Sequence, residues 1–276
     1  DKPIIWMYWE NKEGGKTPDF IRLCWKTIIV NNNRDYQIKI VNNYNIDKYL
    51  PNINKNYSLF NQIAHKADYI RFCLLFEYGG IWLDSDMICF RSLAKIRELI
   101  DEHDFIAMGY KGLDEKIFPL IGFLASKPKN PICQIMINKI DSFLEKVVLD
   151  KEVQPLWDEL GGVALKEIIY EKEQKFFVLD SKFFSPHESN REANVNELYN
   201  KNEVALNFLI KNNHSAFCQS LANSVMDSTF LNLTEDELLR NWNLVSSMFA
   251  LGLGFMLKPD SVVYDLKIEE IGRASC

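Results

Sequence analysis

The feature that most constrains the fold is a helical stretch that runs into two glycines and then into a short apolar run. Residues 62–78 have a helical pattern, and Gly79-Gly80 follows where a left-handed C-cap is expected. The next residues, 81–90 (IWLDSDMICF), are predicted to form one strand. Asp84 and Asp86 therefore stand in an apolar strand, directly after a sharp helix end.

Both acids are expected on one side of that strand, because side chains in an extended strand alternate between its two faces. Trp82, Asp84 and Asp86 share one face in this pattern. Two like charges about 4 Å apart repel by roughly 4 kcal/mol at an effective dielectric of 20, so solvent, a cation or a donated proton has to offset the cost. The spacing thus indicates that a positive partner is missing from the chain itself.

Strands and helices alternate along the rest of the chain. A strand over 4–9, a helix over 17–30 that begins at Thr17-Pro18 and a strand over 36–41 predict an α/β sheet with crossover connections. Further strands are predicted over 104–110, 120–126 and 175–180, and further helices over 130–148 and 160–172.

We expect two parts in the chain. An α/β domain is predicted over residues 1–215, and a mainly helical extension over 216–276, with helices near 216–226, 234–250 and 265–271.

Composition excludes several classes of protein. The chain has 276 residues, a net charge of -6 and no block of Lys or Arg, so nucleic acid is not an expected partner. Its six cysteines form no Cys-x-x-Cys pair, which argues against a zinc cluster and favours a reducing compartment. No apolar run approaches the ~20 residues of a membrane span. A cytoplasmic location is predicted.

Asp68 and Arg71 lie three residues apart, on one face of the helix over 62–78. Taken alone they suggest a surface ion pair worth less than about 1 kcal/mol. Because this helix leads into Asp84 and Asp86, the four polar groups are also expected to face one cleft beyond the carboxyl end of the sheet, where α/β folds usually bind ligands.

The stretch over 65–87 (HKADYIRFCLLFEYGGIWLDSDM) resembles the core of the sugar transferases of the GT-A fold, with Asp-x-x-Arg, an apolar helix, Tyr-Gly-Gly, one strand and Asp-x-Asp. Residues 4–27 are similar to the opening of the bacterial capsular polysaccharide synthesis proteins in that group. The resemblance is close over residues 2–93 and looser as far as 215. It implies a GT-A (Rossmann-like) nucleotide-sugar-binding domain with a mixed central sheet.

The resemblance also implies an activity. Such a protein is a metal-dependent glycosyltransferase that moves a sugar, with retention, from a UDP-linked donor to a glycan or lipid-linked glycan acceptor in surface polysaccharide synthesis. Asp86 is expected to bind Mn²⁺ or Mg²⁺ most directly, and Asp84 to contact the metal or the ribose. Asp68 and Arg71 match positions that hold donor-sugar hydroxyls and orient the diphosphate.

Several further positions carry less specific expectations. Trp9 matches an aromatic residue that stacks on the nucleotide base, with ordinary strand packing as the alternative, and Trp82 is expected on the donor side. A third metal ligand is assigned to Asn207 or His214 without a choice between them. The segment over 157–168 (WDELGGVALKEI) resembles a part of such enzymes that lies near the sugar and the acceptor. Within it, Asp158 or Glu159 is either an acid near the reaction centre or an acid favoured at a helix N-terminus.

Other functions remain open at this point. A haloacid-dehalogenase-type phosphohydrolase also ends a strand with Asp-x-Asp, here Asp84 and Asp86, but Met87-Ile88 and the lack of a later Asp-Asp pair depart from its pattern. A non-catalytic nucleotide-sugar-binding relative and a toxin-like enzyme that glycosylates proteins are two more alternatives. A lipid-linked acceptor would bring peripheral association with the inner face of the membrane.

Overall fold

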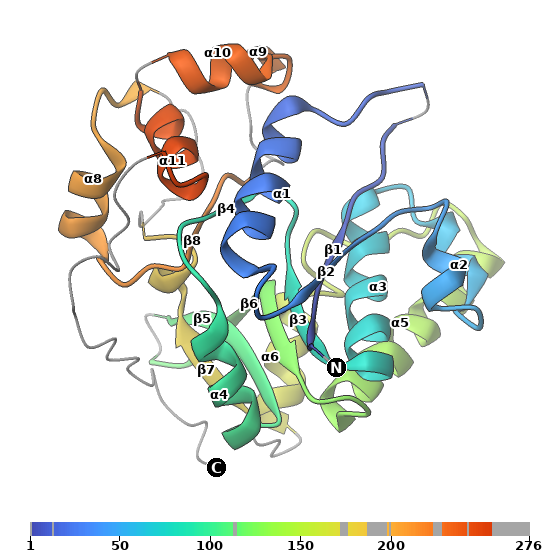
Figure 1. The fold of residues 1–276 in the computed structure, drawn as a ribbon. Helices are drawn as coiled ribbons and strands as arrows, with labels where there is room; N and C mark the ends of the chain where they lie inside the picture. Colours follow the sequence, from blue (N-terminus) through green and yellow to red (C-terminus); the bar gives the residue numbers. More distant parts are fainter. Residues whose placement is uncertain are drawn as a thin grey trace.

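The centre of the fold is a mixed six-stranded sheet in the order β2-β1-β3-β6-β5-β7 (Figure 1). The computed structural model of the chain describes residues 2–12, 14–112, 115–171, 176–186, 198, 200–222, 228–241 and 243–255. The strands of this sheet are β1 (Ile4–Tyr8), β2 (Gln37–Val41), β3 (Gly80–Leu83), β5 (Phe105–Lys111), β6 (Ile117–Ser126) and β7 (Phe177–Asp180).

The strand directions confirm the predicted α/β class with a mixed sheet. β1 pairs in parallel with β2 and β3, and β5 pairs in parallel with β7. β6 runs antiparallel to both β3 and β5. The crossover from β1 to β2 is α1 (Asp19–Asn32), and α3 (Ile63–Tyr78) leads into β3.

Helices cover both faces of the sheet. Trp6 and Tyr8 of β1 join a hydrophobic core with α3, α5 (Pro131–Leu149) and α6 (Gly162–Glu171). Their neighbours Ile5 and Met7 join a second core with α1 and α4 (Ala94–Glu102). This alternation is the strand period of two, and it makes β1 apolar throughout. Shorter helical turns are α2 (Ile46–Tyr49), η1 (Lys55–Leu59) and η2 (Ser181–Phe183).

The junction between α3 and β3 depends on its glycines. Gly79 caps α3 with a φ of 65° and donates its N–H to the Leu75 carbonyl at 2.9 Å. Gly80 has a φ of 97°, and a Cβ on it would lie 2.3 Å from the Ile4 carbonyl oxygen. The predicted end of the helix at a glycine with positive φ is present, but a ψ of -160° places Gly79 outside the left-handed helical region that was expected. The close approach of β1 explains why the second residue is also glycine.

A second, two-stranded sheet and four helices lie beside α1, at the upper left in Figure 1. The sheet pairs β4 (Met87–Cys89) with β8 (Cys218–Ser220) in antiparallel fashion. The helices are α8 (Ala205–Asn212), α9 (Ser228–Leu231), α10 (Glu235–Arg240) and α11 (Leu244–Gly252). Phe208 and Met248 share a third hydrophobic core with Phe20 and Leu23 of α1.

The helix predicted over 216–226 is wrong where β8 lies. Cys218 pairs with Cys89, so a partner about 130 residues away decides the local structure, as tertiary pairing often does for short segments. The helices predicted over 234–250 are present as α10 and α11, and the one over 265–271 lies outside the described residues. The division at residue 215 stays a prediction.

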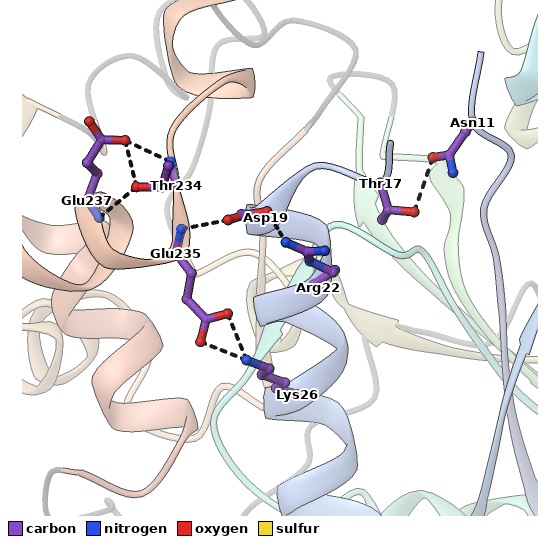
Figure 2. A network of polar contacts seen from close by, with 8 residues as sticks. All are labelled: Asn11, Thr17, Asp19, Arg22, Lys26, Thr234, Glu235 and Glu237. Atoms are coloured by element: carbon purple, nitrogen blue, oxygen red, sulfur yellow. Dashed lines mark hydrogen bonds and ion pairs between the residues drawn. The ribbon is translucent and has the colours of Figure 1, made fainter. Parts of the chain in front are cut away.

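Polar contacts tie α10 to α1. Figure 2 shows Glu235 between two residues of α1: its carboxylate contacts Lys26 Nζ at 2.7 Å, and its N–H donates to Asp19 Oδ2 at 2.8 Å. Thr234 and Glu237 close a capping box at the start of α10. In the part of the chain that the structure describes, no helix has the length and hydropathy of a transmembrane segment.

Candidate active site

A cavity of about 680 Å³ opens where β1 and β3 reach their carboxyl ends. Tyr8 and Trp9 border it from the end of β1, and residues 84–86 border it from the end of β3. The other walls come from the loop before α1, the first turns of α3, residues 157–158 ahead of α6, and the segment around β8. This is the place that α/β topology predicts for a ligand.

Asp84 and Asp86 both line the cavity, although not as members of one strand. β3 ends at Leu83, and a turn at residues 85–86 separates it from β4, which belongs to the second sheet. The turn is held because Asp84 donates its N–H to the Gly122 carbonyl at 2.9 Å and Ser85 Oγ donates to the Tyr8 carbonyl at 2.8 Å. The prediction of one strand over 81–90 is therefore wrong, because backbone pairing changes from one sheet to the other at the acids.

Arg71 organises the acids on the cavity wall. Its Nη2 donates to Asp68 Oδ1 at 2.9 Å, and its Nη1 reaches Asp84 Oδ1 at 3.3 Å and the Ile121 carbonyl. The guanidinium carbon lies 4.8 Å from the ring centre of Trp82, whose indole N–H donates to Asp84 Oδ1 at 2.9 Å. Arg71 and Asp68 are only 4% and 6% exposed. The alternative of a surface ion pair is thus wrong, because this pair is buried.

Asp68 has an unusual proton affinity for a carboxyl group. Burial raises its pKa to about 7, the Arg71 guanidinium opposes the rise, and the negative charges of Asp84 and Asp158 add to it. Both its protonated and its ionised form are therefore accessible near neutral pH. Such a group both donates and accepts hydrogen bonds in the working range of an enzyme.

The acids offer hard oxygen ligands of the kind that Mg²⁺ and Mn²⁺ prefer. Asp84 is 38% exposed at its side chain, and a Cβ at Gly122 would lie 2.9 Å from its Oδ2, so a larger residue would crowd that oxygen. Among the described residues, no three His, Cys, Asp or Glu side chains form a complete metal site. A cation bound by Asp84 and Asp86 would therefore need further oxygens from substrate and water.

The two candidates for a third ligand lie away from the cavity lining. Asn207 is exposed on α8. His214 accepts from Arg91 Nη2 through its carbonyl at 2.6 Å, and neither residue is among those that border the cavity. The assignment of a third protein ligand stays a prediction.

Trp9 borders the cavity with its indole held in place. Its N–H donates to Asn11 Oδ1 at 2.7 Å. Figure 2 shows that Thr17 contacts the same oxygen, with its Oγ1 at 3.2 Å. The Trp9 ring is half-buried, whereas Trp6 is buried in the core. Of these aromatic residues, Trp9 is placed where a flat ring bound in the cavity could stack on it.

Asp158 lies both on the cavity wall and at the start of α6, so its helix-terminus role is present and a place near the reaction centre stays a prediction. It borders the cavity, and its Oδ1 also accepts the Gly162 N–H at 2.7 Å at the start of α6. Its φ of 64° places it in the left-handed region, where a non-glycine residue is uncommon. Glu159 instead accepts the Leu156 N–H at 2.8 Å and does not border the cavity.

Two aromatic residues of the cavity wall, His65 and Trp157, were given no individual role in the sequence, although Trp157 opens the segment over 157–168 that resembles a part of such enzymes near the sugar and the acceptor. His65 is 1% exposed, and neither of its ring nitrogens has a hydrogen-bond partner in the described structure. Burial lowers its pKa, so the ring is neutral. Trp157 is 58% exposed, with its ring centre 6.5 Å from that of His65. The i, i+3 spacing of His65 and Asp68 was the available signal for the histidine, whereas the position of Trp157 depends on the tertiary fold.

The fold and the cavity define the class of this protein: it is an α/β protein with acidic residues around a cavity at the carboxyl edge of its sheet. Comparison with known families identifies the particular family, because residues 1–223 match the family described as capsular polysaccharide synthesis protein. The chain belongs to that family, which confirms the resemblance seen in the sequence.

Individual relatives are more distant. An uncharacterized glycosyltransferase of Acanthamoeba polyphaga mimivirus is 29% identical over 97 residues, which cover 33% of this chain and 35% of the relative. The chain thus spans about a third of that protein.

Solved structures with some likeness include three glycosyltransferases. The PaToxG glycosyltransferase has 16% identity and a TM-score of 0.44, and the match covers 62% of this chain and 69% of that one. The galactosyltransferase LgtC has 12% identity and a TM-score of 0.42, with 79% of this chain and 86% of that one covered. GlyE of Streptococcus pneumoniae has 14% identity and a TM-score of 0.42, and the match covers 88% of this chain and 64% of that one. With such low identities and TM-scores, no residue's role is transferred from these proteins.

Proposed function

We propose that this chain is a metal-dependent glycosyltransferase of surface polysaccharide synthesis. Its donor is a nucleotide sugar, for which we propose a UDP linkage, and its acceptor is a glycan or a lipid-linked glycan. Family membership supports this proposal. The single observation that carries it is that Asp84 and Asp86 border one cavity in which Arg71 holds Asp84 and Asp68 together.

A departing nucleoside diphosphate needs its negative charge neutralised as the bond to the sugar breaks. Asp84 and Asp86 would hold Mn²⁺ or Mg²⁺, which acts as a Lewis acid toward the diphosphate. Two carboxylates suffice, because Mg²⁺ commonly completes its octahedron with substrate phosphates and water.

The chain's own residues orient the donor. Arg71 fixes the Asp84 carboxylate through Nη1, so Oδ1 of that group keeps one direction while its side chain remains partly exposed. Asp68, with its pKa near 7, is suited to bind a hydroxyl group of the donor sugar as donor or acceptor. Trp9, pinned by Asn11, would stack on the base.

Retention is the proposed stereochemical outcome. In this mechanism the acceptor hydroxyl attacks the sugar carbon from the side of the leaving group, and the leaving phosphate oxygen takes the acceptor's proton. No side chain is required as a dedicated base. A lipid-linked acceptor would place the enzyme at the inner face of the membrane as a peripheral protein.

The test combines binding with turnover. Thermal shift against UDP and other nucleoside diphosphates, with and without Mn²⁺, is expected to show stabilisation that requires both nucleotide and metal. Donor hydrolysis in water is then measured for the wild type and for Asp86→Asn, which keeps the size of the side chain but removes its charge. We expect Asp86→Asn to lose the metal-dependent rate by at least about a hundredfold.

Asp47→Asn is the matched control, because Asp47 is an exposed acid paired with Lys55 and does not border the cavity. It should leave donor hydrolysis unchanged. Stabilisation by no nucleoside diphosphate would refute the proposal. Hydrolysis of simple phosphate esters without action on nucleotide sugars would favour the phosphohydrolase alternative, and nucleotide binding without turnover would favour the non-catalytic one.

A further inference from the structure

The outer part of the cavity wall carries an exposed indole that the proposed donor site does not use. Trp157 borders the cavity and is 58% exposed, although tryptophan is usually well buried in a monomeric core. Its chain neighbour Leu156 is 76% exposed and does not border the cavity. The indole of Trp157 is therefore an open apolar surface that belongs to the cavity.

Three cavity-lining residues of α3 lie in a row along the helix. Arg71 is at one end, where it contacts Asp84 and the carbonyl of Ile121 on β6. Because a helix rises about 1.5 Å per residue, Asp68 lies roughly 4.5 Å further toward the start of α3 and His65 roughly 9 Å. The ring of Trp157 lies beside that of His65, so Trp157 stands at the other end of this row from Arg71, and at 58% exposed it is open to solvent.

The Trp157 indole is held in a defined place. Its ring contacts His65, which in turn meets Phe60 edge-on with ring centres 6.0 Å apart. The loop before it is anchored to the start of α3, because Gln154 Oε1 accepts the Asn61 N–H at 2.9 Å and Gln154 Nε2 donates to the Leu59 carbonyl. After it, Asp158 caps α6. An aromatic surface held in this way loses little conformational entropy when a ligand covers it.

We propose that Trp157 is the acceptor platform of the cavity, on which the apolar C–H face of the acceptor's terminal sugar ring stacks. This assignment rests on the proposed glycosyltransferase function. A pyranose has an apolar face and a polar rim of hydroxyl groups, and the site has the same two parts. The indole of Trp157 offers the apolar surface, and the carboxylate of Asp158, the next residue, borders the same cavity.

The position of Trp157 also separates this role from donor binding. Trp9 and the acids at 84 and 86 come from the ends of β1 and β3, whereas Trp157 comes from the loop that leads into α6. Asp158 and Asp68 border the same cavity, and the negative charge of Asp158 adds to the raised pKa of Asp68, so the loop also borders the part of the cavity that α3 lines. An acceptor held on an exposed indole keeps the rest of its glycan in solvent, as a growing polymer requires.

The experiment separates transfer from donor hydrolysis. Wild type, Trp157→Ala, Trp157→Phe and the control Leu156→Ala are assayed with nucleotide sugar and Mn²⁺, first in water alone and then with a panel of methyl β-hexosides and methyl β-N-acetylhexosaminides. Products are quantified by mass spectrometry. We expect Trp157→Ala to raise the KM for the methyl glycoside about tenfold or more while donor hydrolysis changes less than about twofold.

The other variants test whether stacking is the cause. Trp157→Phe keeps a smaller aromatic face and should recover part of the acceptor affinity, and Leu156→Ala should behave as wild type. An unchanged acceptor KM in Trp157→Ala, or an equal loss of hydrolysis and transfer, would refute the assignment of Trp157 as the acceptor platform. Donor hydrolysis by the wild type without transfer to any methyl glycoside would refute the assignment of a sugar as the ligand of Trp157. Absence of hydrolysis in the wild type would instead refute the proposed function.

Discussion

Replacing Arg71 with methionine should destabilise the protein by an amount that depends on pH. Methionine keeps the length and apolar volume of the side chain but removes the charge and the donors to Asp68 and Asp84. Breaking a buried ion pair by removal of one partner costs about 3–5 kcal/mol, because the remaining charge has no counter-ion. This is a large part of the ~5–15 kcal/mol that stabilises a typical domain, so the variant should fold but unfold readily.

The pH dependence follows from Asp68. Its pKa is raised from 3.8 to about 7 in the folded protein, so stability is lost as the pH rises from the lower value to the higher one and then levels off. Without Arg71 the folded-state pKa of Asp68 rises further, so the variant continues to lose stability above pH 7. The difference between the two proteins should therefore widen above pH 7 by up to about 1.4 kcal/mol per pH unit.

Urea denaturation at pH 6.0 and pH 8.5 measures this difference. We expect the loss in free energy of unfolding to be about 2 kcal/mol greater at pH 8.5. Arg22→Met is the matched control, because Arg22 also pairs at i, i+3 with an aspartate, Asp19, but is 50% exposed. It should cost less than about 1 kcal/mol at both pH values. Equal losses for Arg71→Met at the two pH values would show that Asp68 is not the group that Arg71 holds ionised.

Two further predictions concern the backbone. Gly80→Ala should lower the free energy of unfolding by at least about 3 kcal/mol or abolish soluble expression, because the new Cβ would meet the Ile4 carbonyl at 2.3 Å. The control Gly14→Ala also changes a glycine at positive φ (71°), but its Cβ would have nothing within 4 Å, so it should cost clearly less in the same denaturation assay. Thr234→Ala removes the capping box of α10 and should lower the free energy of unfolding by about 1 kcal/mol, while Thr234→Ser should keep it; similar melting curves for both would show that the cap contributes nothing.

Elements defined by short-range chemistry were predictable from the sequence. Gly79 ends α3 because it alone permits the capping φ, Pro18 precedes α1, and Asn130 with Pro131 starts α5. The break between β3 and β4 was not predictable, because β4 pairs with β8, a strand that lies more than a hundred residues further along the chain. A continuous apolar run does not reveal that its two halves pair in different sheets.

In the candidate site too, features set by short-range spacing were predictable and features set by long-range contacts were not. Spacing alone brings Asp68 to the face of Arg71, and the strand that follows brings the acids at 84 and 86 to the same cavity, although their roles stay predictions. Spacing does not give the depth of Arg71, because the Ile121 carbonyl and the Trp82 ring that enclose it come from β6 and β3. The contact between His65 and Trp157 joins residues 92 positions apart, so a single sequence contains no local signal for it.

The composition of α3 connects the fold to the chemistry. Its buried side chains include Tyr69, Ile70, Phe72 and Leu75, which lie all around the helix, because β1, β3 and β6 pack on one side and α5 and η1 on the other. A helix enclosed in this way has no solvent-facing stripe to explain its polar residues. Burial of Asp68 and Arg71 is costly, and their mutual contact offsets part of that cost, together with the contacts of Arg71 to Asp84 and to the Ile121 carbonyl. Asp68 and Arg71 therefore mark the candidate site, and the burial that makes them costly also raises the Asp68 pKa to about 7, which under the proposed function suits it to bind a sugar hydroxyl.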